Sequence, residues 1–301
     1  MQRRTFMQQT AAAGAGLLAS SFVNAKDEKK NTEPFHLNYG IHYGMFENSA
    51  GKNFIDQIKF AYDNGFRSIE DNGFMDRDIA EQKKIGDTLA SLGMNMGVFV
   101  VNFDHWPVQT SLCSGKKEWK EKFLKSCTNA VDCAKRSNAT WMTVVPGNYA
   151  RELSMGLQTA NVIDALRAAC EIFEKHKLVM VLEPLSDTPD LFLRHSDQAY
   201  AVCKAVNSPS CKILFDMYHM QRNEGNIINN IDAYYDEIGY FQIGDNPGRN
   251  EPTTGEMNYK NIFKHIYNKN YKGVLGMEHG NAFDGKEGEM KLIKAYRWSD
   301  D

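Results

Sequence analysis

The chain has 301 residues, of which 42% are hydrophobic and 24% charged, with a formal net charge of −3. A chain of this length can bury one large core or two modest ones. The small negative charge gives no basic surface for nucleic acid, so we expect a small-molecule substrate and no nucleic-acid partner. The six cysteines lack C-x-x-C spacing, which favours buried free thiols, although one or two disulfides stay open.

The first 25 residues have the features of an export signal. Arg3 and Arg4 form a twin-arginine pair, a weakly hydrophobic stretch spans residues 11–23, and small residues end at Ala25. We therefore predict a twin-arginine signal peptide over 1–25, a polar segment over 26–36 and a periplasmic location. The alternative is a basic helix that stays attached. No stretch is long and apolar enough to span a bilayer, so no membrane contact is expected after processing.

After this signal, short apolar runs alternate with stretches of helical periodicity. The apolar runs predict strands over residues 37–42, 68–71, 95–101, 140–145, 178–183, 212–216, 240–243 and 274–278. The periodic stretches predict helices over residues 53–64, 78–92, 117–137, 155–176, 196–206, 227–238 and 259–268. This alternation is typical of an α/β protein with a (β/α)8 TIM barrel, predicted here as a single domain over residues 37–301. A doubly wound open sheet is the rival, but no Gly-rich phosphate loop follows the first strand.

Oxygen-bearing side chains lie at or next to the ends of the last four predicted strands. They are Glu183, Asp216, Gln242 and Glu278. In a barrel these strand ends face one another at the mouth. Each carboxylate alone could be a helix N-cap or a salt-bridge partner, but three together repel one another unless a cation neutralises them. Carboxylates and an amide oxygen are hard ligands, so we expect one divalent metal ion, Mg²⁺ or Mn²⁺. Zn²⁺ is the alternative, because His219 and His279 are close in sequence to two of these residues.

The carboxyl-terminal half carries motifs that are similar to a known family. They are Glu183-Pro184, the block from Asp216 to Gln221, the loop from Gln242 to Tyr259 with Pro247-Gly248-Arg249 and Glu251-Pro252, then Tyr271-Lys272-Gly273 and Met277-Glu278. On these residues the chain resembles the hydroxypyruvate isomerase family of xylose isomerase-like TIM barrels. The resemblance covers most of residues 37–280 and is strong from residue 178 onward.

The resemblance implies a role for several residues. It implies that the metal ligands are Glu183, Asp216, Gln242 and Glu278. It also implies that Glu183 and Glu278 move protons, and that the substrate is surrounded by His219, Arg249 and Glu251. The alternative for Arg249 is a salt bridge with Glu251 or Asp245 that shapes the loop. The alternative for His219 is a structural histidine or one that orients a metal ligand.

The chemistry of such an isomerase suits these side chains. Isomerisation of an α-hydroxycarbonyl moves a proton between neighbouring carbons, and a metal on both oxygens stabilises the enediolate that forms. Two carboxylates on opposite sides of the substrate could remove and return the proton. We therefore expect a metal-dependent isomerase, acting on a small hydroxy-carbonyl or sugar substrate through a metal-bound enediolate. The fork geometry of Arg249 would suit a carboxylate on a hydroxy-keto acid.

Some positions depart from the family pattern. Ser186 stands where Asn is usual, Tyr240 where His is common, and His279 where Tyr is common. The loop after the third predicted strand also differs from the usual one. We expect the residues that line the pocket and choose the substrate to include His42, Glu70 and Trp106. Trp106 could stack on a sugar, with ordinary packing as the alternative.

Other functions compete with the isomerase. A sugar epimerase, or a lyase or dehydratase acting on a keto-sugar, would begin from the same enediolate. A nuclease of this barrel group would need a His-rich metal cluster and a basic face, which the sequence does not offer. A non-catalytic exported sugar-binding barrel would be signalled by loss of Glu183 or Glu278, and both are present. The helices predicted over 155–176 and 259–268 could support a homodimer, although an ordinary barrel surface would look the same.

Overall fold

The computed structural model describes residues 33–101 and 110–301. The predicted signal peptide, most of the polar segment after it and Trp106 lie outside these residues. Phe35 is buried and its ring packs against Tyr39 and Phe66, so the packed body begins slightly before residue 37. In the two described ranges, no helix has the length and apolar character needed to cross a membrane.

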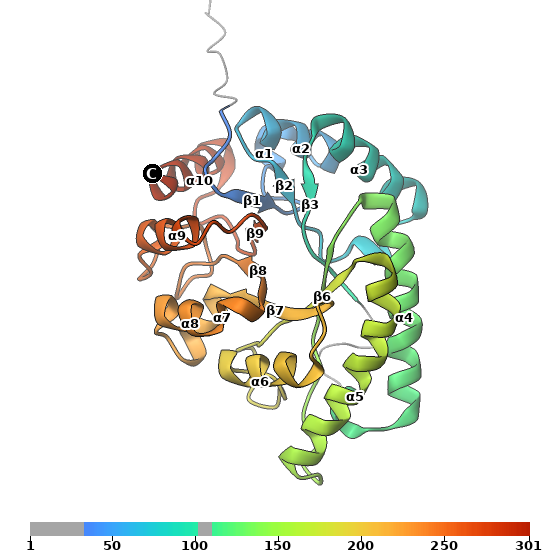
Figure 1. Cartoon of the computed structure of the whole chain (residues 1–301). Coiled ribbons are helices and arrows are strands. Elements are labelled where there is room, and N and C mark those ends of the chain that lie inside the picture. Colours follow the sequence, from blue (N-terminus) through green and yellow to red (C-terminus); the bar gives the residue numbers. More distant parts are fainter. Residues whose placement is uncertain (1–32, 102–109) are drawn as a thin grey trace, which may run out of the picture. The chain divides into compact units, whose positions relative to one another are not determined.

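The strands form one sheet in which every paired strand runs parallel to its neighbour. They are β1 (Asn38–Ile41), β2 (Ser68–Ile69), β3 (Asn95–Met96), β4 (Phe99–Val100), β5 (Trp141–Val144), β6 (Val179–Leu182), β7 (Cys211–Asp216), β8 (Ile238–Gln242) and β9 (Val274–Gly276). Their order is β3-β2-β1-β9-β8-β7-β6-β5-β4. Only two residues separate β3, which pairs with β2, from β4, which pairs with β5. This segment therefore joins the two ends of the sheet and confirms the predicted TIM barrel (Figure 1).

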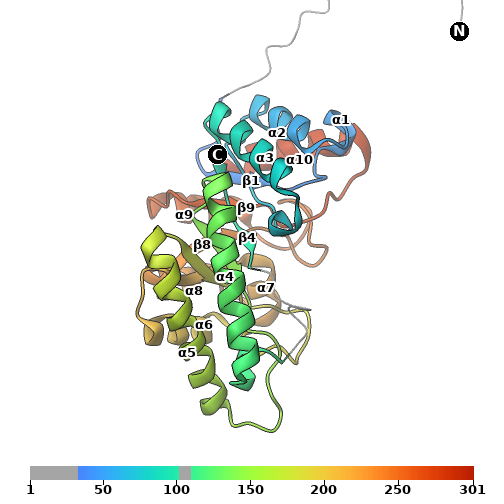
Figure 2. The same ribbon diagram turned by 90° about the vertical axis from the view of Figure 1, so that its right-hand side faces the viewer.

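Helices connect the strands and cover the outside of the sheet (Figures 1 and 2). They are α1 (Glu47–Ala50), α2 (Phe54–Asp63), α3 (Ile79–Leu92), α4 (Lys117–Ser137), α5 (Met155–Phe173), α6 (Ser196–Val206), α7 (Met217–Asn223), α8 (Ile227–Tyr234), α9 (Tyr259–Asn268) and α10 (Gly285–Asp300). Short 3₁₀ turns are η1 (Phe74–Asp76), η2 (Leu112–Ser114), η3 (Glu174–His176) and η4 (Tyr235–Glu237). The predicted helices over 117–137, 196–206 and 259–268 match α4, α6 and α9 in full.

Three helices of the structure were not predicted. α1 has only four residues, too few for a periodic pattern, and α7 begins directly after β7 without a loop between them. α10 buries Leu292, Ile293 and Tyr296 on one face, but its other residues are mostly polar. These three helices depend on packing against the barrel, because short or weakly apolar helices gain little from propensity alone.

One large hydrophobic core joins the sheet to the helices, and a smaller cluster lies around Val98, Val181, Leu214, Tyr240 and Val274. The six cysteines are all buried and none forms a disulfide. They pack as small hydrophobic side chains, as the spacing predicted.

Gly86 marks a close approach between α3 and α4. A Cβ at this position would lie 1.9 Å from the carbonyl oxygen of Arg136, so the two helices would have to separate. We expect Gly86→Ala to lower the free energy of unfolding by about 1–3 kcal/mol, measured by urea denaturation. The matched control is Gly156→Ala in α5, where a Cβ meets no atom within 4 Å. That variant should be neutral or slightly stabilising, and an equal loss in both would contradict the packing argument.

Candidate active site

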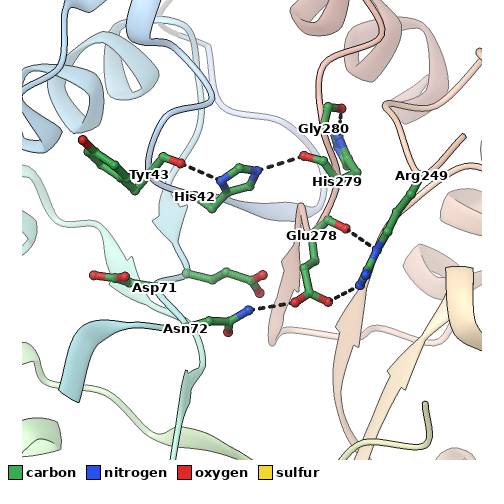
Figure 3. Close-up of a pocket in the computed structure, with 9 residues that line it drawn as sticks. His42, Tyr43, Asp71, Asn72, Arg249, Glu278, His279 and Gly280 are labelled. Atoms are coloured by element: carbon green, nitrogen blue, oxygen red, sulfur yellow. Dashed lines mark hydrogen bonds and ion pairs between the residues drawn. The ribbon is translucent and has the colours of Figure 1, made fainter. Parts of the chain in front are cut away.

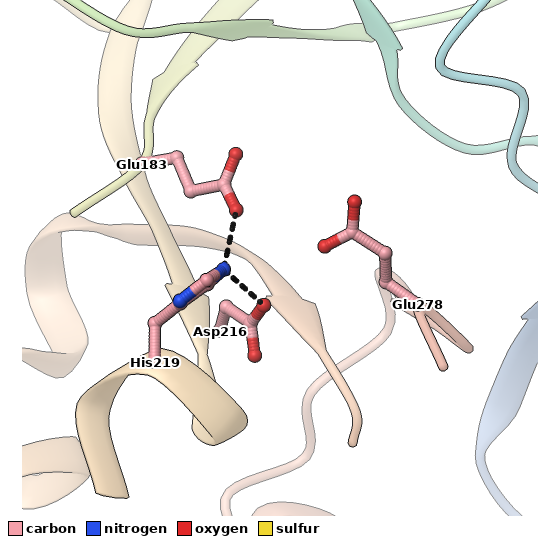
Figure 4. A group of neighbouring side chains, drawn as sticks. All are labelled: Glu183, Asp216, His219 and Glu278. Atoms are coloured by element: carbon pink, nitrogen blue, oxygen red, sulfur yellow. Dashed lines mark ion pairs between the residues drawn. The ribbon is translucent and has the colours of Figure 1, made fainter. Parts of the chain in front are cut away.

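The carboxyl ends of the strands bring four side chains together (Figure 4). Glu183 follows β6, Asp216 ends β7, and Glu278 comes two residues after β9. His219, in the first turn of α7, is the fourth member, and one ligand atom of each lies within 4.8 Å of the others. The sheet register pairs Gln242 of β8 with Asp216. The structure thus joins three of the predicted ligands in one cluster and places the fourth on the neighbouring strand; their binding of a metal stays a prediction.

Asp216 combines a structural task with its place in this cluster. Its Oδ1 accepts a hydrogen bond of 2.7 Å from the backbone N–H of Tyr218 and so caps the N-terminus of α7. Its Oδ2 remains on the cluster side, where it lies 3.5 Å from Nε2 of His219. The alternative that this carboxylate is a helix N-cap is therefore correct for Oδ1. Oδ2 takes no part in the cap and belongs to the cluster.

Burial and nearby negative charge raise the pKa of two carboxyl groups in the site, Glu183 and Glu278. Burial, followed by the charges of Glu278 and Asp216, raises the pKa of Glu183 well above its usual value. Burial also raises the pKa of Glu278 to about 7, although Arg249 acts in the opposite direction. A carboxyl group with a pKa of about 7, like that of Glu278, can both accept and return a proton near neutral pH, as an isomerisation requires.

Arg249 is the cation that faces the cluster. Its Nη2 donates to Oε2 of Glu278 at 2.7 Å and to Oδ2 of Asp216 at 3.2 Å, and its Nε donates to the backbone oxygen of Glu278. Its guanidinium also lies 4.8 Å from the ring centroid of Tyr218. Its ion pairs are therefore with the site carboxylates, and the alternative of a loop-shaping bridge to Glu251 or Asp245 is wrong.

His219 has hydrogen-bonding neighbours at both ring nitrogens. The backbone N–H of Ser186 donates to Nδ1 at 3.1 Å, and the Ser186 hydroxyl lies 2.8 Å from the same nitrogen. Burial lowers the pKa of this imidazole. Nη2 of Arg249, which can only donate, lies 3.2 Å from Nε2. That nitrogen faces Asp216 and lies 3.9 Å from Oε1 of Glu183. These contacts fix the orientation of the ring and turn Nε2 toward the carboxylates of the cluster.

The side chains of the site fit a divalent cation. Three carboxylates lie close together, and one arginine balances only part of their charge. The Oε1 atom of Gln242 is buried and has no hydrogen-bond donor among the described residues. A buried carbonyl oxygen without a partner costs about 1–3 kcal/mol, which a cation would offset. Carboxylate and amide oxygens are the ligands that Mg²⁺ and Mn²⁺ prefer.

A cavity of about 390 Å³ opens beside Glu278 (Figure 3). Its lining residues are His42, Tyr43, Glu70, Asp71, Asn72, Arg249, Glu278, His279 and Gly280. His42 and Glu70 thus reach the cavity, as expected. Nδ1 of His42 lies 2.8 Å from the backbone oxygen of Tyr43, and Nε2 lies 2.9 Å from the backbone oxygen of His279. His42 therefore links the loops after β1 and β9. Asn72, which was not predicted as a site residue, donates to Oε1 of Glu278 at 2.7 Å. Its position shortly after β2 is the one sequence feature that could have indicated a place in the site.

Two further predicted residues have other neighbours. Glu251 is buried, and its Oε2 accepts a hydrogen bond from the backbone N–H of Ala282. It does not line the cavity, so its contact with substrate stays a prediction. His279 directs Nε2 to the hydroxyl of Tyr296 at 2.7 Å, and its Nδ1 lies 2.8 Å from the oxygen of Gly280. Both its nitrogens are used in this way, which removes one of the two reasons for considering zinc.

The raised pKa of Glu278 predicts how stability depends on pH in metal-free protein. A group whose pKa is higher in the folded than in the unfolded state stabilises the fold at low pH, and this stabilisation is lost as pH rises through the folded value. We expect the free energy of unfolding in chelator to fall between about pH 5 and pH 8, by on the order of 3 kcal/mol for Glu278 alone. Urea denaturation across this range tests it. Glu278→Gln should flatten the profile, and a stability that rises with pH would contradict the assignment.

In the described residues the strands form a closed parallel barrel of eight segments, with β3 and β4 counted as two parts of one segment. Such a barrel with carboxyl groups clustered at the carboxyl ends of its strands defines a TIM-barrel enzyme. Residues 58–298 match the Xylose isomerase-like TIM barrel family, and the chain belongs to that family.

Curated relatives and solved structures agree with this assignment. The chain is 29% identical over 247 residues to hydroxypyruvate isomerase of Escherichia coli, covering 81% of this chain and 92% of that protein. It is 25% identical to 2-oxo-tetronate isomerase of Cupriavidus necator, covering 75% and 86%. These relatives are isomerases, which confirms the expected enzyme class.

Two solved structures show the same fold. An AP endonuclease of family 2 from Brucella melitensis has a TM-score of 0.74 at 21% identity, with 84% of this chain and 96% of that chain covered. A 3-keto-D-glucoside 4-epimerase from E. coli has a TM-score of 0.73 at 18% identity, with 87% and 99% covered. At these identities the likeness establishes the barrel alone.

Proposed function

We propose that this chain is a divalent-metal-dependent isomerase that moves a proton between neighbouring carbons of a small α-hydroxycarbonyl compound. The observation that carries the proposal is the pair Glu183 and Glu278. Both carboxyl groups lie in one cluster beside a cavity, and burial raises the pKa of each. The curated relatives named as isomerases of hydroxypyruvate and of 2-oxo-tetronate support this reaction class and a small substrate.

The residues of the chain divide the work as follows. Glu183 and Glu278 take and return the proton at the carbon next to the carbonyl group. Asn72 holds one oxygen of Glu278 in place, and His219, whose Nε2 faces the cluster, would contact a substrate oxygen. Glu183, Asp216, Gln242 and Glu278 would hold the cation, with Mg²⁺ or Mn²⁺ favoured. When bound, the cation supplies a Lewis acid that favours the enediolate over the neutral substrate.

Hydrogen exchange in D₂O tests the reaction class. The metal-loaded protein would be incubated with hydroxypyruvate, 2-oxo-tetronate, ketoses and keto-sugars, and the C–H signals followed by NMR. We expect deuterium at the carbon next to the carbonyl of one compound, and no exchange after chelation. Absence of exchange across the panel with metal bound would contradict the proposal. Analysis of the products of a positive reaction separates isomerisation from epimerisation and from loss of water.

Arg249 lines the cavity and is proposed to meet an acidic group of the substrate. Replacing it by Ala removes a charge-assisted hydrogen bond, so KM for an acidic substrate should rise about 10–100-fold with a smaller change in kcat. Arg249→Lys keeps the charge but loses the fork of donors, so its KM should lie between those of the wild type and Arg249→Ala. Steady-state kinetics on acidic and neutral substrates provide the measurement. An unchanged KM in both variants would mean that Arg249 pairs with the carboxylates of the site and does not bind the substrate.

We also propose export by the twin-arginine route, on the basis of Arg3 and Arg4. Residues 1–25 fused to a folded reporter should carry it out of the cytoplasm of a bacterial host, and the Arg3→Lys, Arg4→Lys variant should not. Equal export of both fusions would contradict the assignment.

A further inference from the structure

We propose that Glu70 and Tyr240 form a buried support that orients the carboxamide of Gln242, so that its oxygen is turned to the metal position. The inference rests on the proposed metal dependence and adds two positioning residues to it. Glu70 follows β2, and Tyr240 and Gln242 both lie in β8. Because residues two apart in a strand share a face, Tyr240 and Gln242 present their side chains on the same side of the sheet.

The contacts between the three side chains form a small closed network. Nε2 of Gln242 donates to Oε1 of Glu70 at 3.1 Å and to Oε2 at 3.3 Å. The hydroxyl of Tyr240 donates to Oε2 of Glu70 at 3.2 Å. Glu70 and Gln242 are each 1% exposed and Tyr240 is 0% exposed, so these bonds are largely shielded from solvent. Both oxygens of Glu70 are therefore engaged within the barrel.

This network determines which end of the amide faces the cluster. A carboxylate offers only acceptors, so it binds the NH₂ end of the Gln242 carboxamide and leaves the oxygen on the opposite side. That oxygen is buried and meets no donor in the part of the chain that the structure describes. Without Glu70, either end of the amide could turn toward Asp216, and an NH₂ group cannot coordinate a cation.

Two glycines provide the space for this support. A Cβ at Gly276 in β9 would lie 1.7 Å from Oε2 of Glu70. A Cβ at Gly97, between β3 and β4, would lie 2.3 Å from the hydroxyl of Tyr240. Any larger residue at these positions would displace the carboxyl or hydroxyl group. The surrounding strands thus accommodate a polar pair where a barrel interior ordinarily holds apolar side chains.

Holding Glu70 in this place has an energetic cost in the metal-free protein. Glu70 is buried and lies within the electrostatic influence of the Glu278 carboxylate. A buried carboxyl group that faces other carboxyl groups weakens the fold unless it has another task. Orientation of a ligand is such a task, since partners that hold metal ligands typically contribute 10–100-fold to metal affinity.

The test compares Mn²⁺ affinity with metal-free stability in the full chain. Isothermal titration calorimetry would give the Kd for Mn²⁺, and urea denaturation in chelator would give the free energy of unfolding. We expect Glu70→Ala and Glu70→Gln to raise the Kd about 10–100-fold. Metal-free Glu70→Gln should be no less stable than the wild type, because a buried carboxyl group is removed.

Two further variants separate positioning from a general structural role. The exchange Glu70→Gln with Gln242→Glu reverses donor and acceptor, so the amide at position 70 can hold the new carboxylate and Mn²⁺ affinity should recover toward wild type. Glu237→Gln alters a buried carboxylate at the opposite end of β8, where it pairs with Lys212, and should leave the Kd unchanged.

Each contrary result has a distinct meaning. Wild-type affinity in both single variants of Glu70 would overturn the positioning role and leave the proposed function intact. Weakened binding in all variants, in step with lost metal-free stability, would also overturn it in favour of a structural role. A wild-type protein that binds no divalent metal would overturn the metal dependence and this inference together.

Discussion

Glu278→Gln is expected to leave the barrel folded and to reduce turnover by about 10²–10⁴-fold. The amide has nearly the same shape as the carboxyl group, but it cannot accept a proton. It also keeps one oxygen for the hydrogen bond from Asn72 and loses the charge that pairs with Arg249. Turnover would be measured on the compound that the D₂O exchange experiment identifies, and folding by circular dichroism and urea denaturation.

A matched variant distinguishes this effect from a general loss of charge. Glu171→Gln makes the same chemical change on the exposed face of α5 and should retain full activity. Turnover in Glu278→Gln that equals that of the wild type would exclude Glu278 from proton transfer. Loss of the fold in Glu278→Gln would instead show that the ion pair with Arg249 holds the barrel mouth together.

Addition of Mn²⁺ or Mg²⁺ to metal-free protein is the second large effect. A ligand that binds only the folded state stabilises it by about 4 kcal/mol when its concentration is a thousand times its Kd. The physical reason is the relief of repulsion among Glu183, Asp216 and Glu278. Among the residues that the structure describes, Arg249 is the one arginine or lysine that pairs with them. Thermal unfolding with metal and with chelator measures the shift.

Asp216→Asn provides the control for this experiment. Asn is as good an N-cap as Asp, so the start of α7 should be preserved. The variant loses one carboxylate of the cluster, and the metal-dependent rise in stability should shrink or disappear. If no divalent ion tested changes the unfolding temperature of the wild type, the metal site is contradicted.

Much of the fold could be predicted because its signals are local. The alternation of apolar runs with helical periodicity located all nine strands in the described part of the chain, with β3 and β4 predicted as one strand over residues 95–101. It also placed α4, α6 and α9 at their observed bounds. The split between β3 and β4 could not be read in this way. It occurs at Gly97, where the hydroxyl of Tyr240, more than a hundred residues away, takes the space of a side chain. Contacts between distant segments of this kind leave no periodic trace in the sequence.

The candidate site was predictable to the extent that it follows the ends of strands. A carboxylate directly after an apolar run is visible in the sequence, which is how Glu183, Asp216 and Glu278 were identified. The partners of these residues were not visible. Asn72 meets Glu278 across 206 positions of the chain, and the ion pairs of Arg249 with Asp216 and Glu278 were mistaken for loop contacts in one of the alternatives.

The sequence by itself determined the barrel, its family and the strand ends that carry the acidic groups, because these depend on periodicity and on short motifs. Only the tertiary structure decided which atoms meet. It turned His279 toward Tyr296, gave Nδ1 of His219 the N–H of Ser186, and set the amide of Gln242 against Glu70. These choices depend on hydrogen bonds between different strands and loops. Closure of the sheet into a ring brings those elements together, and no property of the separate segments specifies it.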